Sequence, residues 1–426
     1  MKLKISNLGV IDSMTIDMSK PFILFAGSNG TGKTYASTFL YTLILELRLY
    51  LYMFFKNGNR LPSDNEESNG YQEGSLDADT LYDYLEQFLK EQKEQVLESM
   101  NLNIDVTSFK CEIVTTKEEW RHEMFEKSVS SYMLKKDKNS VKYQIEKDTK
   151  ELDLIHYLQA ILLISLYFDN VNGAYIFTAE RSGIYTFSKE LSVGRLRFPE
   201  QLTYRRYPRP ISDGLANAED LVNRKKEKTL HSKFADEIEN KILHGSLSIT
   251  DDGEVLFSIR ENKELGINES SSAIKTLAPI VFYLRYIAWH SSILFVDEPE
   301  LNLHPMNQIL LARIFVKMIN AGLRLIISTH SDYIIREINN MIMADILNKN
   351  GDKIVKSMGY DKSLCLSQEM FSPYLFKMTD SGNVVVSELE VDKYGFSMPS
   401  IDDAINQQNE VTNAFYDVLR YDYPQV

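Results

Sequence analysis

The chain has 426 residues, of which 44% are hydrophobic and 25% charged, a globular balance that excludes disorder as the default. Its formal net charge of −13 at pH 7 disfavours attraction to nucleic-acid phosphates over the whole surface. Two cysteines far apart, Cys111 and Cys365, argue against a disulfide framework and fit a reducing cytoplasm. No signal-peptide core and no apolar run of the ~18 residues that a membrane span needs are present, so we expect a soluble cytoplasmic protein without a membrane partner.

The first 50 residues predict strands followed by a helix. Residues 2–8 alternate apolar and polar side chains and residues 14–16 resume the alternation, which predicts two strands. An apolar run at 22–26 predicts a buried strand that ends in a glycine-rich turn, and a helix is expected from about 32 to 52.

A helix-rich insertion is expected next, over residues 51–170. It opens with an Asn-, Asp-, Glu-, Ser- and Gly-rich segment at 57–79, the composition of an exposed loop. Helical spacing follows at 81–100 and 152–167, and strand patterns at 110–115 and 140–145.

The second half alternates short apolar strands with helices. Strands are expected at 175–179, 293–296 and 325–328, and helices at 273–289 and 306–319. Fully apolar short strands are covered by helices on both faces, so the sequence predicts an α/β fold with a largely parallel central sheet and an N-terminal antiparallel portion. The expected domains are a discontinuous core at 1–50 and 171–345, the insertion at 51–170, and a small C-terminal α/β extension at 346–426 with strands at 375–379 and 384–389 and a helix near 404–419.

A glycine-rich motif lies between the buried strand and the first helix. It matches the P-loop (Walker A) pattern G-x-x-x-x-G-K-[ST], and consists of Gly27, Ser28, Asn29, Gly30, Thr31, Gly32, Lys33 and Thr34. The glycines let backbone N–H groups turn toward phosphates, and the helix N-terminus adds a favourable dipole. Lys33 would place its charge at the β- and γ-phosphates, and the Thr34 hydroxyl would ligate Mg²⁺. The motif therefore predicts a site for ATP with Mg²⁺.

Two later strands deliver polar side chains to the same edge of the sheet. The apolar run at 293–296 is followed by Asp297 and Glu298, which would hold Mg²⁺ and act as general base toward the attacking water, respectively. The run at 325–328 leads to His330, placed to contact a γ-phosphate. Together with the P-loop, these residues predict ATP hydrolysis.

Several segments carry a resemblance to a known family. LKISNLGVID, GSNGTGKT, FTAERSG, SSSAIKTLAP, ILFVDEPELNLHP and IISTHSDYII resemble the ABC-type ATPase heads of the RecF, SMC and OLD-nuclease group, and more narrowly the stand-alone AAA-labelled ATPases of bacterial anti-phage systems. The resemblance spans most of residues 1–345 and implies that two protomers sandwich the nucleotide. A serine-rich signature of one protomer would cap the γ-phosphate at its neighbour's site.

Ser270, Ser271 and Ser272 match that signature, although Ala273 stands where a glycine is common, which leaves open which serine makes the contact and whether they only cap a helix. Asn302 stands where this group often has histidine, which weakens any role for that position. Arg181, in the FTAERSG segment, could face either the nucleotide or the insertion.

The resemblance implies a self-associating regulatory ATPase that controls a separate effector protein in anti-phage defence, with a phage-derived trigger. The alternative is a DNA repair or recombination ATPase, for which residues 192–233 would supply the contact through ten basic against five acidic residues. An OLD-type nuclease is disfavoured because 346–426 is too short for its metal-binding domain and lacks an Asp-x-Asp pair. A transporter ATPase subunit is disfavoured by the long insertion, and a non-hydrolysing scaffold by Glu298.

Overall fold

The computed structural model describes residues 1–56, 67–68, 71–102, 104–126, 134–137, 140–146, 173–186, 207–225, 227–259, 263–288 and 292–422. The helix predicted at 152–167 lies outside these residues, as does part of the basic segment 192–233.

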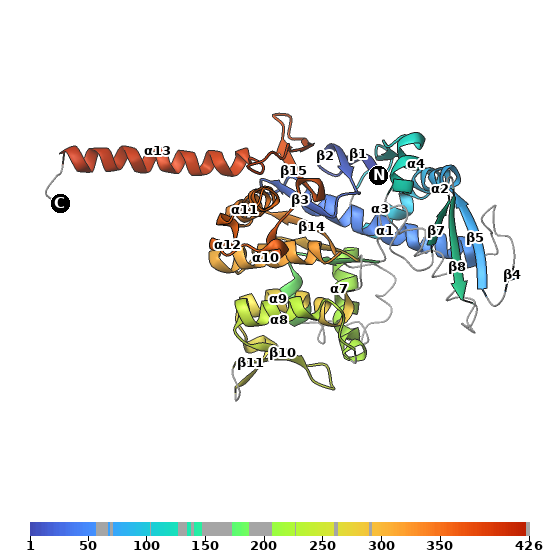
Figure 1. Ribbon diagram of the computed structural model, residues 1–426, viewed down its shortest axis with the longest axis horizontal. Helices are drawn as coiled ribbons and strands as arrows, with labels where there is room; N and C mark the ends of the chain where they lie inside the picture. Colours follow the sequence, from blue (N-terminus) through green and yellow to red (C-terminus); the bar gives the residue numbers. More distant parts are fainter. Residues whose placement is uncertain are drawn as a thin grey trace.

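A nine-stranded sheet forms the centre of the fold, with strand order β6-β1-β2-β16-β15-β3-β14-β13-β9 (Figure 1). Five neighbouring strands run parallel: β15 (Phe371–Met378), β3 (Phe22–Gly27), β14 (Arg324–Thr329), β13 (Ser292–Asp297) and β9 (Gly173–Phe177). The other four are β16 (Val384–Glu388), β2 (Ile11–Asp17), β1 (Lys2–Leu8) and β6 (Lys110–Ile113), with antiparallel pairs β15–β16, β1–β2 and β1–β6. The predicted α/β fold class, with its antiparallel N-terminal portion, is confirmed.

Helices cover both faces of the parallel strands, which explains the apolar runs within β3, β13 and β14. Along β3, Ile23 and Phe25 join one hydrophobic core, which includes α1 (Lys33–Lys56), whereas Phe22 and Leu24 join a second core on the opposite face. The second core contains residues of α9 (Ser272–Phe282), α10 (Pro305–Asn320) and α11 (Asp332–Lys349). Every residue of β3, β13 and β14 is buried, because alternate side chains point into the two cores.

The C-terminal segment contributes to the central sheet before it leaves the body. β15 pairs with the P-loop strand β3, and β16 lies between β15 and β2, so both strands predicted in the extension belong to the central sheet. α13 (Pro399–Asp422) then projects away from the rest of the molecule (Figure 1). Its side chains from 406 to 420 are exposed, including Val411, Phe415 and Val418.

The insertion differs in detail from the prediction. The loop expected at 57–79 is wrong in part, because β4 (Glu67–Ser68) and β5 (Tyr71–Asp77) form a four-stranded antiparallel sheet with β8 (Ser140–Glu146) and β7 (Leu134–Asp137). Pairing along the whole of β5 with β8 overrides its polar composition. The single helix expected at 81–100 is two helices, α2 (Ala78–Glu91) and α3 (Lys93–Met100), and α4 (Lys117–Glu126) follows.

The helix expected at 273–289 is α-helical only in its first part. α9 ends at Phe282 and continues as a π-helical turn, Tyr283–Ile287, just after Pro279, whose ring nitrogen cannot donate the helical hydrogen bond. The prediction missed α7 (Arg209–Arg224), α8 (Ser232–Ile238) and a small sheet of β10 (Ser246–Ile249), β11 (Val255–Ser258) and β12 (Glu264–Gly266). Among the described helices, none combines the length and apolar character needed to cross a membrane.

Candidate nucleotide-binding site

The P-loop connects β3 to α1 through three glycines with positive φ. The φ angles are +145° at Gly27, +76° at Gly30 and +87° at Gly32. A Cβ atom at Gly27 would lie 2.3 Å from the carbonyl oxygen of Phe376 in β15, and one at Gly32 would lie 2.9 Å from the Val10 and Ile11 side chains. The loop therefore needs glycine both for its backbone path and for its close contacts.

Lys33, the first residue of α1, folds over this loop. Its Nζ donates hydrogen bonds to the carbonyl oxygens of Gly27 (3.0 Å) and Ser28 (2.9 Å), and the residue is 6% exposed. Burial lowers the pKa of Lys33, while Asp297, Glu298 and Glu300 act in the opposite direction. A buried ammonium with only carbonyl partners fits a polyphosphate, because the phosphate charge would offset the cost of burial.

The P-loop meets the end of β13 through a shared hydrogen-bond network. The Thr34 hydroxyl donates to Asp297 Oδ2 (2.8 Å), and the Ser328 hydroxyl donates to Asp297 Oδ1. Ser328 is placed there by the parallel register of β13 and β14, in which it is the partner of Asp297. The Thr34 hydroxyl and the Asp297 carboxylate are the hard oxygen ligands that Mg²⁺ prefers, so these two residues would hold the ion.

Glu298 follows Asp297 in a left-handed backbone conformation, with a φ of +47°. Its N–H donates to the Ser328 carbonyl (2.9 Å), and its Oε1 lies 3.8 Å from His330 Nε2. Burial and the neighbouring Asp297 raise the pKa of Glu298. Glu298 and His330 line a cavity of about 270 Å³ together with Val10 and residues 29–35. A carboxylate with a raised pKa beside the P-loop suits a general base.

His330 is held by a residue that the sequence analysis did not single out. Glu300 Oε1 accepts hydrogen bonds from the backbone N–H of His330 (2.7 Å) and from the Thr329 hydroxyl (2.9 Å). Burial lowers the pKa of the His330 imidazole, as does the charge of Lys33, while Asp297 acts in the opposite direction; the net shift favours the neutral ring. A neutral imidazole can donate one hydrogen bond to a phosphate oxygen. Ser328 and Glu300 carry one signal in the sequence, their position at or just after the end of an apolar strand.

Arg181 and Asn302 lie behind the cavity. The Arg181 guanidinium is 1% exposed and donates to backbone carbonyls, including those of Asp297 and Glu298, and not toward the cavity. Asn302 Nδ2 donates to the Thr276 hydroxyl (3.1 Å) in α9. Neither residue lines the P-loop cavity.

The three serines lie at the start of α9, outside the cavity lining. The Ser270 hydroxyl donates to the Gly266 carbonyl (3.0 Å), and Ser271 is the N-cap, accepting from the Ile274 N–H (3.5 Å). Ser271 and Ser272 are exposed, whereas Ser270 is buried. A contact of these serines with a neighbouring protomer's nucleotide stays a prediction, and the exposed pair is the one free to make it.

Ion pairs within the chain engage several members of the basic segment 192–233. Arg209 pairs with Glu46 and Asp213, and Arg224 pairs with Asp220. Lys225 Nζ lies 2.6 Å from Asp251 Oδ1. In the described part of this segment, the positive charge is thus substantially offset by nearby carboxylates.

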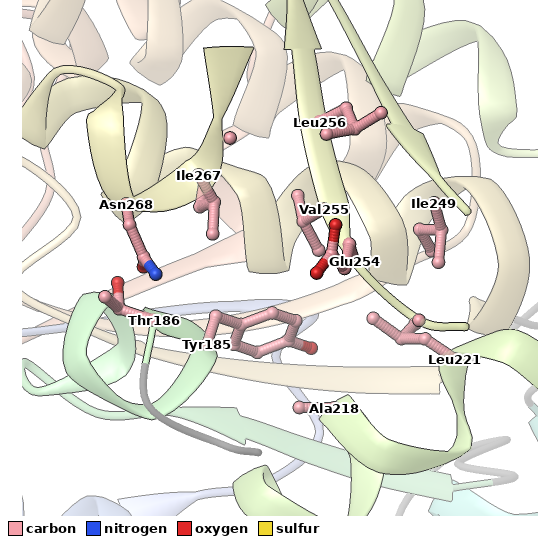
Figure 2. A pocket seen from close by; sticks show the side chains of 12 residues that line it. Tyr185, Thr186, Ala218, Leu221, Ile249, Glu254, Val255, Leu256, Ile267 and Asn268 are labelled. Atoms are coloured by element: carbon pink, nitrogen blue, oxygen red, sulfur yellow. The ribbon is translucent and has the colours of Figure 1, made fainter. Parts of the chain in front are cut away.

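A second cavity, of about 210 Å³, lies between α7, the helical residues Tyr185 and Thr186, and the β10–β12 sheet (Figure 2). Its lining mixes apolar side chains, such as Leu221 and Ile267, with polar ones, such as Glu254 and Asn268. It shares no lining residue with the P-loop cavity.

Comparisons with known proteins identify the family. Residues 45–335 match the family model of the AAA ATPase domain (AAA_15), a match that includes the β13 carboxylates and His330. No curated protein matches the chain.

Similar solved structures are SMC heads. A SmcHead bound to the C-winged helix domain of ScpA is 12% identical with a TM-score of 0.38, and covers 92% of this chain and 98% of its own. An Smc head domain from Pyrococcus furiosus, bound to the C-terminal domain of ScpA, is 13% identical with a TM-score of 0.36, covering 96% and 98%. The SMC head domain from Thermotoga maritima is 10% identical with a TM-score of 0.34, covering 92% and 98%. These TM-scores are too low to add to the argument, and the assignment rests on the family match. The chain belongs to the AAA ATPase domain family.

Proposed function

We propose that this protein binds ATP with Mg²⁺ in the P-loop cavity and hydrolyses it to ADP and phosphate. The observation that carries the proposal is the meeting of Thr34, Asp297 and Ser328 in one hydrogen-bond network, next to a cavity that Lys33 and Glu298 line. Lys33 binds the β- and γ-phosphates, and Mg²⁺ held by Thr34 and Asp297 would supply positive charge that neutralises the phosphates. Glu298 orients and deprotonates the attacking water, and His330 donates a hydrogen bond to the γ-phosphate.

The binding part of this proposal is tested by Lys33→Ala. The substitution removes the charge that offsets the phosphates, so the Kd for ATP should rise at least about tenfold, corresponding to ~1.4 kcal/mol. Lys241→Ala is the matched control, because Lys241 is exposed and pairs with Glu237 away from the cavity. Equal ATP affinity of both variants in equilibrium dialysis would refute the binding site.

We further propose that ATP drives self-association of the protein, with each site completed by a neighbour. What supports this is the open cavity, whose lining lacks Ser270, Ser271 and Ser272, and the exposure of the last two. Sedimentation of a Glu298→Gln protein should show a larger assembly with ATP than without it.

A substitution can distinguish a contact of these serines with a neighbour's nucleotide from a role only in capping α9. Ser271→Asp keeps an N-cap of equal preference but adds a negative charge, so folding is preserved while an approaching γ-phosphate is repelled. The expected result is normal unfolding with lost ATP-dependent association. Unchanged association in Ser271→Asp and in Ser272→Asp would assign the serines to capping alone.

The assembly is proposed to control a separate effector protein in anti-phage defence, in response to a phage-derived trigger. The resemblance of the sequence motifs to stand-alone defence ATPases supports this role. α13 supports a protein partner, because it projects from the body with exposed apolar residues on an otherwise acidic helix (Figure 1). A solitary helix without packing is only marginally stable in water, so a partner would stabilise it. Co-expression with the product of the adjacent gene, with and without ATP, tests for an effector complex.

A DNA repair or recombination ATPase is the second candidate, and the segment 192–233 is the feature that favours it. The internal ion pairs of Arg209, Arg224 and Lys225 leave less free charge for phosphates than the sequence suggests. The described residues also contain no group of three or more His, Cys, Asp or Glu that could hold a metal ion, so a nuclease centre gains no support there. Duplex DNA that stimulates ATP turnover, with an affinity falling steeply with salt, would promote the DNA candidate over the effector switch.

A further inference from the structure

We infer that Arg181 is a positioning residue that fixes the backbone of Glu298 and fastens it to α9. The inference rests on the proposed role of Glu298 as general base. It concerns a side chain that cannot reach the nucleotide itself, because its guanidinium is 1% exposed and does not line the P-loop cavity.

The guanidinium joins three segments of the chain through backbone carbonyls. Its Nη1 donates to Asp297 O (2.7 Å) and Thr178 O (3.0 Å), and its Nη2 donates to Glu298 O (2.9 Å). Its Nε donates to Thr276 O (3.2 Å), one turn into α9. Four hydrogen bonds from one planar, rigid group set the relative positions of the β9 turn, the β13 end and α9.

Glu298 needs such support because of its backbone conformation. A φ of +47° is unfavourable for a residue with a side chain, and it persists only where its surroundings enforce it. The N–H of Glu298 donates to Ser328 O (2.9 Å), while its carbonyl accepts from Arg181. The peptide groups on both sides of the Glu298 Cα are thereby held, which directs the side chain toward His330 and the cavity.

The same loop has a second connection to α9. Asn302, with a φ of +60°, donates from Nδ2 to the Thr276 hydroxyl (3.1 Å), in the residue whose carbonyl binds Arg181. The serines proposed to meet a neighbouring protomer lie at the start of this helix. Through Arg181, displacement of α9 would therefore move the general base.

Burial explains why arginine suits this position. Desolvation lowers the pKa of Arg181 to about 10, while the carboxylates of Asp297, Glu300 and Glu298 act in the opposite direction. The group stays charged at pH 7, and a charged donor strengthens each bond to a carbonyl. Lysine would keep the charge but cannot reach three segments with a planar fork.

Arg181→Lys is the test, with Arg324→Lys as the matched control. Arg324 is also buried, and its guanidinium donates to the backbone carbonyls of Met18 and Lys20, but at the opposite end of β14 from His330. We expect Arg181→Lys to lower kcat for ATP about 100-fold, as misplacement of a reacting group by about 1 Å does, while KM changes less than about threefold. Arg324→Lys should lose stability without this effect on kcat.

A double variant identifies the residue through which Arg181 acts. If Arg181 acts only by positioning Glu298, the Arg181→Lys/Glu298→Gln protein should hydrolyse ATP no more slowly than Glu298→Gln alone. Multiplicative losses, or a KM raised by Arg181→Lys, would show a direct contact with nucleotide and overturn the inference.

Hydrogen exchange of the nucleotide-free protein gives a readout independent of activity. The backbone amides of Glu298 and of residues 300–302 should exchange faster in Arg181→Lys than in the parent, and not in Arg324→Lys. Unchanged exchange and unchanged kcat in Arg181→Lys would refute the inference. If Arg181→Lys does not fold, Asn302→Gly, which preserves the positive φ, tests the second connection by the same exchange. In that case, unchanged exchange rates of these amides in Asn302→Gly would refute the connection between the loop after β13 and α9. A different result would refute the proposed function itself, namely ATP hydrolysis by Glu298→Gln at the parental rate.

Discussion

Replacing Gly27 with alanine tests how closely the C-terminal strand β15 packs against the P-loop. The new Cβ would lie 2.3 Å from the carbonyl oxygen of Phe376, although contacts below 3.0 Å are essentially never seen for a real Cβ. The backbone oxygen cannot rotate away, because β15 is paired with β3 on one side and β16 on the other. The strands must therefore separate locally.

The cost has two parts. A φ of +145° is open essentially only to glycine, which costs about 1–3 kcal/mol for alanine. Overpacking against Phe376 adds about 1–3 kcal/mol. At Gly30 a Cβ would meet nothing within 4 Å, so Gly30→Ala carries only the left-handed backbone cost of about 1–2 kcal/mol.

Urea unfolding followed by circular dichroism compares the two variants directly. With a slope of about 3 kcal/mol per molar urea, a loss of about 4 kcal/mol shifts the midpoint by roughly 1.3 M for Gly27→Ala, against about 0.5 M for Gly30→Ala. ATP affinity of Gly27→Ala should fall as well, since the loop must move. Equal midpoints for the two variants would contradict the packing of β15 against the loop.

Three further predictions concern the metal ligand, the general base and α13. Thr34→Val should raise the Mg²⁺ concentration needed for half-maximal hydrolysis at least about tenfold, whereas Thr34→Ser, which keeps the hydroxyl, should not; a metal titration in which both behave like the parent would exclude Thr34 as a ligand. Because burial and Asp297 raise the pKa of Glu298, kcat should be lost as pH falls through a midpoint above the ordinary value of 4.5, and full activity should lie above that midpoint. A pH profile that stays flat down to pH 4.5 would contradict this assignment. Phe415→Asp with Val418→Asp should change the free energy of unfolding by less than about 0.5 kcal/mol, because both side chains are exposed on α13, while binding of an effector is lost. A clear drop in the unfolding midpoint would mean that α13 packs against the body.

The fold class followed from local patterns in the sequence. The runs at 22–26 and 293–296 are apolar throughout and the run at 325–328 is apolar up to Ser328, which is typical of strands covered on both faces. The pairing of β15 with β3 was not predictable in this way, because it joins residues about 350 positions apart and leaves no local signal. β5 was missed because its polar residues are paired in a hairpin-like sheet that composition does not reveal.

In the candidate site, too, the residues marked by a local sequence pattern could be predicted and those placed by tertiary contacts could not. The P-loop residues, Asp297, Glu298 and His330 could be predicted because a short motif or a strand end carries each of them. Ser328 and Glu300 act through partners on another strand, so their roles depend on register and loop geometry. The contacts of Arg181 are to carbonyl oxygens, which every residue possesses, and no sequence pattern marks them.

The role of Glu298 as general base for ATP hydrolysis in the P-loop cavity can be examined with one paired measurement. ATP binding and phosphate release are measured on the same preparations of the parent protein and Glu298→Gln. The variant should bind ATP with a Kd within about threefold of the parent and release phosphate about 10²–10⁴-fold more slowly. Phosphate release by Glu298→Gln at the parental rate would show that Glu298 is not the general base.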